Sequence, residues 1–299
     1  MNFPANRDFD APVVGGLLHG GIWGADASPP VLAIHGITAS HLAWATVARA
    51  LPERRLIAPD LRGRGASATL PGPWGMARHA DDVVAALDHL GVEKAQIVGH
   101  SMGAFVAAVV ARRHPDRVSS LLLVDGGLPL ELPPGVTLDD LDRTLGPAAE
   151  RLGMTFESPE AYRAFWRSHP AFAEHAPAEL DAYVDYDLAS VAGELKSRTS
   201  ADAMRYDSRE LYGGDVVVDA LEALGGAILL TAPRGLQNEK PGLYPPEALA
   251  RWQQRVPELT ILEVEHVNHY TIVMGERGAA TVAGVIRSQW AALQVEDGH

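Results

Sequence analysis

The chain has 299 residues, a formal net charge of −13 and no cysteine. The lack of cysteine excludes disulfides, a thiol nucleophile and cysteine-ligated metals. The charges form no basic run, which argues against nucleic acid or an anionic membrane surface as a partner. Residues 1–10 are polar, and no apolar run approaches the roughly 20 residues of a membrane-spanning helix, so we expect a cytoplasmic protein. Lysine occurs only at positions 94, 196 and 240, an arginine-rich composition typical of a GC-rich bacterial genome.

The first 127 residues alternate between short apolar runs and helical patterns. One or two edge strands are expected within residues 13–23, followed by buried strands at 31–35, 55–60, 95–98 and 118–125. Continuous apolar runs of this length are typical of strands that are covered on both faces. Between them the pattern predicts helices over about 40–51, 76–90 and 101–114, the first with Ser40 as its N-cap.

This alternation lapses over residues 128–214, where we expect aromatic-rich helices and no strands. It resumes with strands at 227–232 and 259–265 and helices over 247–256 and 278–293. Strands separated by helices predict a doubly wound, mainly parallel sheet. We therefore expect a core of residues 1–127 and 215–299. Residues 128–214 are expected to form a helical cap over the carboxyl ends of the strands, where ligands bind in such sheets.

The sequence Gly99-His-Ser-Met-Gly103 lies between a predicted strand and a predicted helix. This is the G-x-S-x-G pattern in the strand–turn–helix context that gives it chemical meaning. A serine on so sharp a turn has a strained backbone, and its hydroxyl projects above the sheet. The two glycines allow close approach of strand and helix, and the helix N-terminus favours negative charge there. The motif therefore predicts that Ser101 is a nucleophile.

Four features of the chain resemble the α/β-hydrolase superfamily and occur in its order. They are His35-Gly36 after the first central strand, Asp60-Leu-Arg-Gly-Arg-Gly65 after the next, the motif at 99–103, and a histidine after the last strand. The resemblance covers nearly the whole chain and is weakest in the cap. It implies an α/β-hydrolase fold with a helical cap inserted after the sixth strand. Within it, Asp60 and Arg62 resemble the family's loop-stabilising pair.

A serine hydroxyl is a poor nucleophile and needs an adjacent base. Two histidines lie in the loop that directly follows the last predicted strand. We favour His269, because it lies a few residues beyond Glu265, where members of the family place theirs. His266 directly follows the strand and is expected to be turned toward packing.

Two backbone N–H groups are expected to form an oxyanion hole, which binds the negative oxygen of an acyl-transfer intermediate. They belong to Met102, which follows the nucleophile, and Ile37, which follows His35-Gly36. We expect His35 to fix its own loop by hydrogen bonding. His100 is likewise expected to be structural.

The third member of a catalytic triad has several candidates. Most family members place an aspartate after the seventh strand, but the loop 231–241 contains Asn238 and Glu239 instead. An asparagine can orient an imidazole but cannot stabilise its charged form. A minority of the superfamily takes its acid from the end of the sixth strand, which is Asp125 here. We rank Asp125 first and Glu239 second, and a weak or absent acid at Asn238 remains the third alternative.

These residues predict a serine hydrolase that cleaves a carboxylic ester, lactone or thioester of a small, fairly apolar molecule. The same frame also supports C–C bond hydrolysis and cyclase or lyase chemistry in natural-product pathways. Because Asn238 lies where most family members have an aspartate, a ligand-binding protein with a degraded triad remains an alternative. No motif indicates a metal or an organic cofactor. The sequence leaves the oligomeric state open.

Overall fold

The computed structural model describes residues 7–132, 135, 137–138, 146–174, 176–191 and 193–297. Its centre is an eight-stranded sheet with the strand order β1-β2-β4-β3-β5-β6-β9-β10. The strands are β1 (Arg7–Val13), β2 (Gly16–Trp23), β3 (Pro30–Ile34), β4 (Arg55–Pro59), β5 (Ala95–His100), β6 (Val118–Val124), β9 (Ile228–Thr231) and β10 (Thr260–Glu263).

The sheet is mainly parallel. Neighbouring strands from β4 to β10 pair in parallel, whereas β1 with β2 and β2 with β4 are antiparallel. Every residue of β5 is buried, as expected for a central strand covered on both faces. The prediction of a doubly wound, mainly parallel α/β sheet is confirmed.

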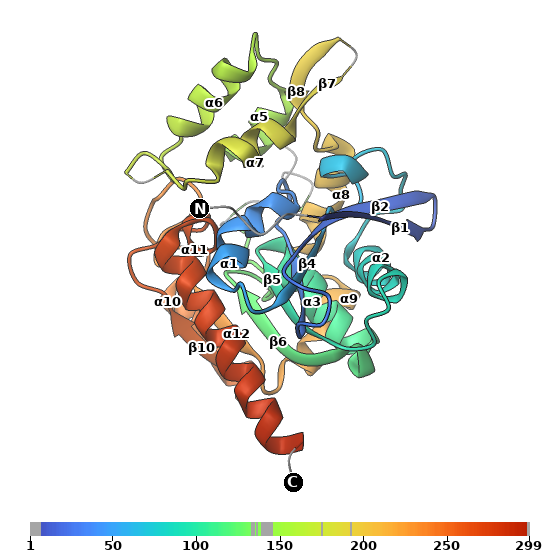
Figure 1. Ribbon diagram of the computed structural model, residues 1–299. Helices are drawn as coiled ribbons and strands as arrows, with labels where there is room; N and C mark the ends of the chain where they lie inside the picture. Colours follow the sequence, from blue (N-terminus) through green and yellow to red (C-terminus); the bar gives the residue numbers. More distant parts are fainter. Residues whose placement is uncertain are drawn as a thin grey trace.

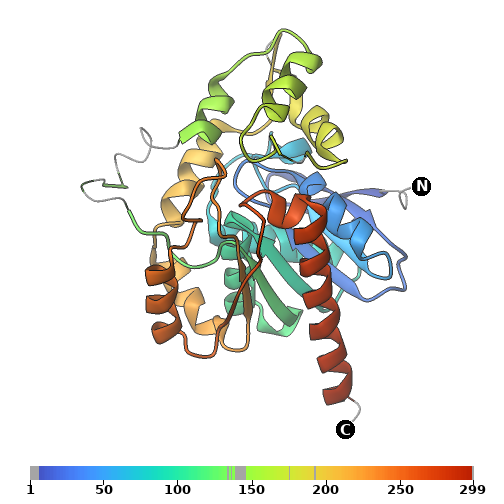
Figure 2. The same ribbon diagram turned by 90° about the vertical axis from the view of Figure 1, so that its left-hand side faces the viewer.

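Helices cover both faces of the sheet (Figures 1 and 2). On one face α3 packs against α2 and α9, and on the other α1 packs against α12. None of the described helices is both long and apolar enough to cross a lipid bilayer. The helices of this core are α1 (Ala45–Ala50), α2 (Met76–His89), α3 (Met102–Arg113), α9 (Asp215–Ala220), α10 (Pro246–Arg255), α11 (Thr271–Met274) and α12 (Glu276–Asp297), with 3-10 turns at His41–Trp44, Gly65–Ser67, Pro115–Arg117 and Leu221–Leu224.

The chain between β6 and α9 contains further helices and a hairpin, most of which lie above the sheet in Figure 1. The expectation of no strands here is wrong, because β7 and β8 form an antiparallel pair next to Gly193, whose φ is 86°. Strands this short leave too little alternation to be detected. The cap prediction also covers positions 133–134, 136, 139–145, 175 and 192, which lie outside the described residues. The described elements are α5 (Gly146–Gly153), α6 (Pro159–Arg167), α7 (Leu180–Asp187), β7 (Leu188–Val191), β8 (Glu194–Ser197) and α8 (Ala201–Glu210).

The first helical segment begins differently from the prediction. Ser40 makes no side-chain cap bond, and a 3-10 turn starts at His41. The backbone N–H of His41 donates instead to Oδ1 of Asp60, at 2.8 Å. The carboxylate at the end of β4 therefore takes the place of the predicted N-cap.

Asp60 and Arg62 both stabilise loops, but through separate partners. Asp60 binds His41, whereas Arg62 donates from Nε and Nη2 to the carboxylate of Asp82 at 2.8 and 3.0 Å. The guanidinium also donates to the carbonyls of Val14 and Pro71. The side chains of Arg62 and Asp82 are each only 2% exposed, so water does not reach the two charges and each is stabilised by the other.

We expect Asp82→Asn to lower the free energy of unfolding by about 3–5 kcal/mol, because it leaves the Arg62 charge buried and unpaired. Urea denaturation measures this change. The neighbouring Asp81 pairs with Arg113 at the surface, where its side chain is 38% exposed. Asp81→Asn is therefore the matched control and should change stability by less than about 1 kcal/mol. Equal losses in the two variants would contradict the importance of the buried pair.

Candidate active site

Ser101 occupies a sharp turn between β5 and α3. Its φ is 55°, a left-handed conformation that is strained for a residue with a side chain. The turn is tightly packed: a Cβ atom at Gly99 would lie 2.1 Å from the carbonyl oxygen of Gly103. One at Gly103 would lie 2.1 Å from the carbonyl oxygen of Ile34. The two glycines therefore allow the close approach that the motif predicts.

Three of the predicted site residues form one chain of hydrogen bonds. Nε2 of His269 lies 3.0 Å from Oγ of Ser101, and its Nδ1 lies 2.7 Å from Oδ2 of Asp125. A carboxylate can only accept, so Nδ1 of His269 carries the hydrogen and Nε2 is left to accept from the serine hydroxyl. Asp125 is fully buried, and His269 is 4% exposed.

The end of β6 holds Asp125 in place. Its φ is 46°, and its backbone N–H donates to the carbonyl of Leu230 at 2.7 Å. Oδ1, which does not face the histidine, accepts from the N–H of Ala232 at 3.0 Å. A Cβ atom on the next residue, Gly126, would lie 2.1 Å from the carbonyl oxygen of Ser101, so this turn packs directly on the serine. Both carboxylate oxygens thus have partners, which offsets the cost of burying the group.

The other candidate acids lie elsewhere. Glu239 is exposed and accepts from the N–H of Gln237 at 2.6 Å. Oδ1 of Asn238 accepts from Nδ2 of Asn268 at 3.1 Å. Within the described parts of the chain, neither Glu239 nor Asn238 contacts the ring of His269 through a hydrogen bond.

Asn268 organises the loop that carries His269, and sequence reasoning did not detect it. Its Oδ1 accepts from the N–H groups of Tyr270 and Thr271, at 3.1 and 2.9 Å, directly before and at the start of α11. Its Nδ2 donates to the carbonyl of Ala171, at 2.9 Å, and links this loop to the segment before α7. The expectation that His266 is turned toward packing is wrong: with a φ of 62° its side chain points outward, is 74% exposed and has Nε2 3.9 Å from the Glu265 carboxylate, away from the serine.

The two expected oxyanion residues, Ile37 and Met102, lie on separate segments, and His35 fixes the segment that carries Ile37. Nδ1 of His35 donates to the carbonyl of Gly36 at 2.8 Å, and Nε2 accepts from the N–H of Leu61 at 2.9 Å. Burial lowers the pKa of His35 to about 4, so the ring is neutral at pH 7. Ile37 lines a cavity at Ser101, and Met102 is the first residue of α3, where backbone N–H groups lack helical acceptors.

Arg64 joins these two segments and is a second residue that the sequence did not single out. It is fully buried and donates from Nε to the carbonyl of Ile37, at 2.8 Å. Its Nη2 lies 3.9 Å from the sulfur of Met102. Its Nη1 donates to Oδ2 of Asp207 in α8, at 2.5 Å. His79 also binds Asp207, at 2.9 Å. The arginine stands inside the 60–65 motif, but its partner is 143 residues away and no local pattern indicates it.

The hollow at Ser101 is small. It has a volume of about 40 Å³, and its described lining contains no lysine, arginine, aspartate or glutamate. Tyr183 of α7 contributes to it, which brings the segment above the sheet to the serine. The remaining lining residues are Gly36, Ile37, Thr38, Ala39, Ala43, His100, Leu236, His269, Tyr270, Val273 and Met274.

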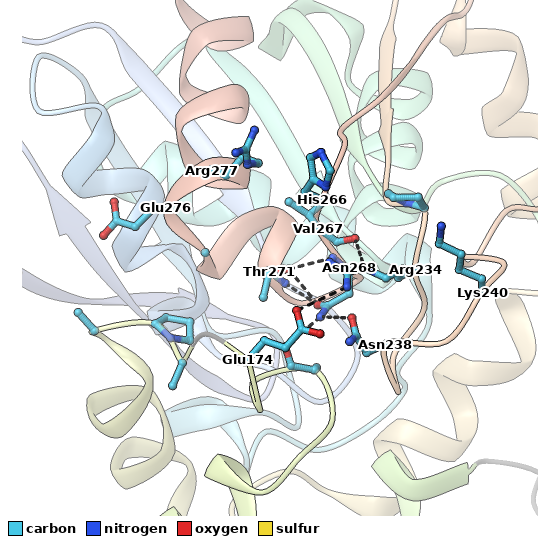
Figure 3. A pocket seen from close by; sticks show the side chains of 16 residues that line it. Glu174, Arg234, Asn238, Lys240, His266, Val267, Asn268, Thr271, Glu276 and Arg277 are labelled. Carbon is cyan, nitrogen blue, oxygen red and sulfur yellow. Dashed lines mark hydrogen bonds and ion pairs between the residues drawn. The ribbon is translucent and has the colours of Figure 1, made fainter.

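A much larger hollow, of about 800 Å³, lies beside this site (Figure 3). It is lined by polar and charged side chains such as Glu174, Arg234, Asn238 and Asn268, but not by Ser101 or His269. Since the candidate reactive atoms border the small cavity, volume alone does not identify the active site.

Among the described residues, His19, His41 and Asp60 form the group whose donor atoms could hold a metal, within 4.8 Å of one another. Oδ1 of Asp60 already accepts two bonds from His41, at 2.8 and 3.0 Å. Oδ2 accepts from the N–H of Ala66 and the hydroxyl of Tyr186, at 2.9 and 2.5 Å. These bonds use both oxygens, and we assign the group a structural role.

Comparisons with known proteins agree with this architecture. Residues 29–174 match a family described as alpha/beta hydrolase fold. The chain is 33% identical over 188 residues to the lipase LipV of Mycobacterium tuberculosis, covering 62% of this chain and 68% of that protein. It is 30% identical over 180 residues to a 2-hydroxymuconate semialdehyde hydrolase of Pseudomonas sp., covering 58% and 55%. The solved structure of E-2-(acetamidomethylene)succinate hydrolase shares the fold, with a TM-score of 0.75, 23% identity and coverage of 95% and 100%.

The neutral, buried His35 makes stability depend on pH. Its pKa is about 4 in the folded chain against 6.5 for the free group, so the unfolded chain binds the proton more readily. The contribution of His35 is complete above pH 6.5 and is lost as the pH falls toward 4. We expect the unfolding free energy of His35→Gln, measured in urea, to fall less steeply over this range than that of the wild type. The exposed His89 provides the control, since His89→Gln should keep the wild-type slope; parallel curves for His35→Gln would contradict the argument.

Proposed function

Since the chain belongs to the α/β-hydrolase family, we propose that it is a serine hydrolase that cleaves a carboxylic ester of a small, fairly apolar substrate through an acyl-enzyme. The observation that carries the proposal is the hydrogen-bonded chain Ser101–His269–Asp125, with spacings of 3.0 and 2.7 Å. These are the distances over which a base can take the hydroxyl proton of a serine.

In the proposed mechanism Oγ of Ser101 attacks the ester carbonyl while Nε2 of His269 takes its proton. Asp125 holds the ring in the required tautomer and stabilises the imidazolium. The N–H groups of Ile37 and Met102 bind the oxyanion. The imidazolium then protonates the leaving alcohol as the C–O bond breaks. Water attacks the acyl-enzyme with His269 again as base, and the proton returns to Ser101.

The size and lining of the cavity support a short, neutral acyl group. Its volume of about 40 Å³ is far below the roughly 300–1,000 Å³ of pockets that hold drug-sized ligands. Its described lining has no ion to recognise a charged acyl chain. Since Tyr183 of α7 borders it, we propose that residues 128–214 act as a cap that selects the substrate.

The names of the relatives do not select one bond. One is a lipase and another a 2-hydroxymuconate semialdehyde hydrolase, so C–C bond cleavage stays the alternative within enzymes. A cyclase or lyase has no specific observation in its favour. The buried carboxylate on His269 argues against a ligand-binding protein with a degraded triad.

The assignment of the acid is testable with four variants assayed on p-nitrophenyl acetate. Ser101→Ala and His269→Ala should lower kcat at least about 10⁴-fold, and Asp125→Asn about 10³- to 10⁴-fold. Glu239→Gln is the matched carboxylate control and should stay within about threefold, because Glu239 is a surface group. Ser101 should be labelled by a fluorophosphonate in the wild type and not in Ser101→Ala. Absence of labelling would support the ligand-binding alternative.

The small cavity leads to a preference for short acyl chains. We expect kcat/KM on p-nitrophenyl esters to fall about tenfold or more from acetate to octanoate, because a longer chain must displace packed side chains. Leu236 borders the cavity, and Leu236→Ala should shift the preference toward longer chains. Leu262 is 45% exposed on β10, so Leu262→Ala should keep the wild-type profile. A wild-type optimum at octanoate would refute the short-chain preference.

A further inference from the structure

His100 has one ring nitrogen whose role is clear and one whose role is not. The residue ends β5 next to Ser101 and is 5% exposed. Its Nε2 lies 2.8 Å from the carbonyl oxygen of His269, to which it must donate, since a carbonyl only accepts. The hydrogen of the neutral ring is therefore on Nε2, and Nδ1 presents a lone pair.

This lone pair is buried and unpartnered. Among the described residues nothing donates a hydrogen bond to Nδ1 of His100. A lone acceptor in the interior costs about 1–3 kcal/mol, and such groups in native proteins call for an explanation. Burial, with the nearby His269, holds the pKa of His100 well below its usual range, so the ring does not relieve this cost by taking up a proton at neutral pH.

His100 borders the same space as the candidate nucleophile. His100 and Ser101 both line the small cavity. A carbon at the Cβ position of Gly36 would lie 3.5 Å from Oγ of Ser101 and 3.7 Å from Nδ1 of His100. Oγ of Ser101 and Nδ1 of His100 therefore lie on the same side of Gly36, close enough for one small bound group to interact with both residues. His79 also has a buried, unpartnered Nδ1, but it belongs to the Asp207 network and lines no cavity near Ser101.

We propose that Nδ1 of His100 accepts a hydrogen bond from a hydroxyl group bound in the Ser101 cavity. The inference rests on the proposed function, because it concerns the same site. The described lining of the cavity has no carboxylate to pair with a cation, so a neutral O–H donor fits it better than an ammonium group.

This hydroxyl has two sources that are compatible with the chemistry. One is the hydrolytic water: its oxygen bonds to the acyl carbon, one hydrogen passes to Nε2 of His269, and His100 holds the other. The bond from the acyl carbon to Oγ of Ser101 then breaks and the serine regains a proton. The other source is a hydroxyl on the acyl group itself, which His100 would bind without taking part in proton transfer.

Two substitutions separate the two nitrogens of the ring. In His100→Gln the amide reaches the place of Nε2 and can still donate to the carbonyl of His269, but the acceptor at the Nδ1 position is removed. In His100→Asn the amide oxygen takes the place of Nδ1, and the bond to the carbonyl of His269 is lost. If His100 has only a structural role, the asparagine variant should lose more activity. If the proposal is correct, the glutamine variant should lose more.

The experiment is a stopped-flow comparison of p-nitrophenyl acetate with p-nitrophenyl glycolate, which carries one more hydroxyl on the acyl group. If water is the donor, His100→Gln should slow deacylation of both esters about tenfold and leave the acylation burst nearly intact. If the acyl hydroxyl is the donor, acylation by the glycolate ester alone should fall about tenfold. Either result supports the proposal if the same rate falls less in His100→Asn than in His100→Gln. An unimpaired glutamine variant, or equal losses in both variants, overturns it.

Two further measurements keep this test separate from that of the proposed function. Thermal melting and fluorophosphonate labelling of Ser101 show whether each variant is folded with a reactive serine. Nitrogen NMR of the imidazole at pH 7 should find the hydrogen of His100 on Nε2. A hydrogen on Nδ1 overturns the proposal whether or not the protein hydrolyses esters. Absence of labelling in the wild type instead refutes the serine hydrolase.

Discussion

The hydrogen bond between Nδ1 of His269 and Asp125 is the contact on which the candidate site depends. It sets the tautomer of the ring and thereby leaves Nε2 free to face Ser101. It also joins the ends of strands that are distant in sequence, since Asp125 in turn binds the N–H of Ala232 after β9. A parallel sheet brings these carboxyl ends to one edge, so the fold itself supplies most of the geometry.

Buried polar side chains fix the remaining loops around this edge. Arg64 holds the Ile37 loop and Asp207 of α8, while Asn268 holds the loop of His269 and the carbonyl of Ala171. Each joins a loop beside Ser101 to the chain between β6 and β9. Because such groups are costly to leave unpaired, the elements they join are held in one arrangement. The site is therefore preorganised by contacts that lie outside the reacting atoms.

Most of the sheet agrees with the sequence prediction, because apolar runs mark its strands. The sharp turn at Ser101 and the placement of His269 beside it also follow from local patterns, a glycine-flanked serine and the position after the last strand. The catalytic roles of these two residues stay predictions. The acid is different. Asp125, Glu239 and Asn238 all lie near the carboxyl edge, and only the path of the 231–241 loop decides which faces the ring. Long-range partners such as Asp207 have no local signature, and the short β7–β8 pair carries too little alternation to be detected.

One loop separates the two hollows. Residues 266–268 line the hollow of about 800 Å³, whereas His269 and Tyr270 line the cavity of about 40 Å³. His266, Val267 and Asn268 are seen on the wall of the large hollow in Figure 3, and Ser101 is not among its lining residues. Its mixture of Glu174, Arg234 and Lys240 also differs from the neutral lining around the serine. If the proposed function is correct, the ester carbonyl has to enter the small cavity, and we expect the side chains packed around it, rather than the larger hollow, to select the acyl group.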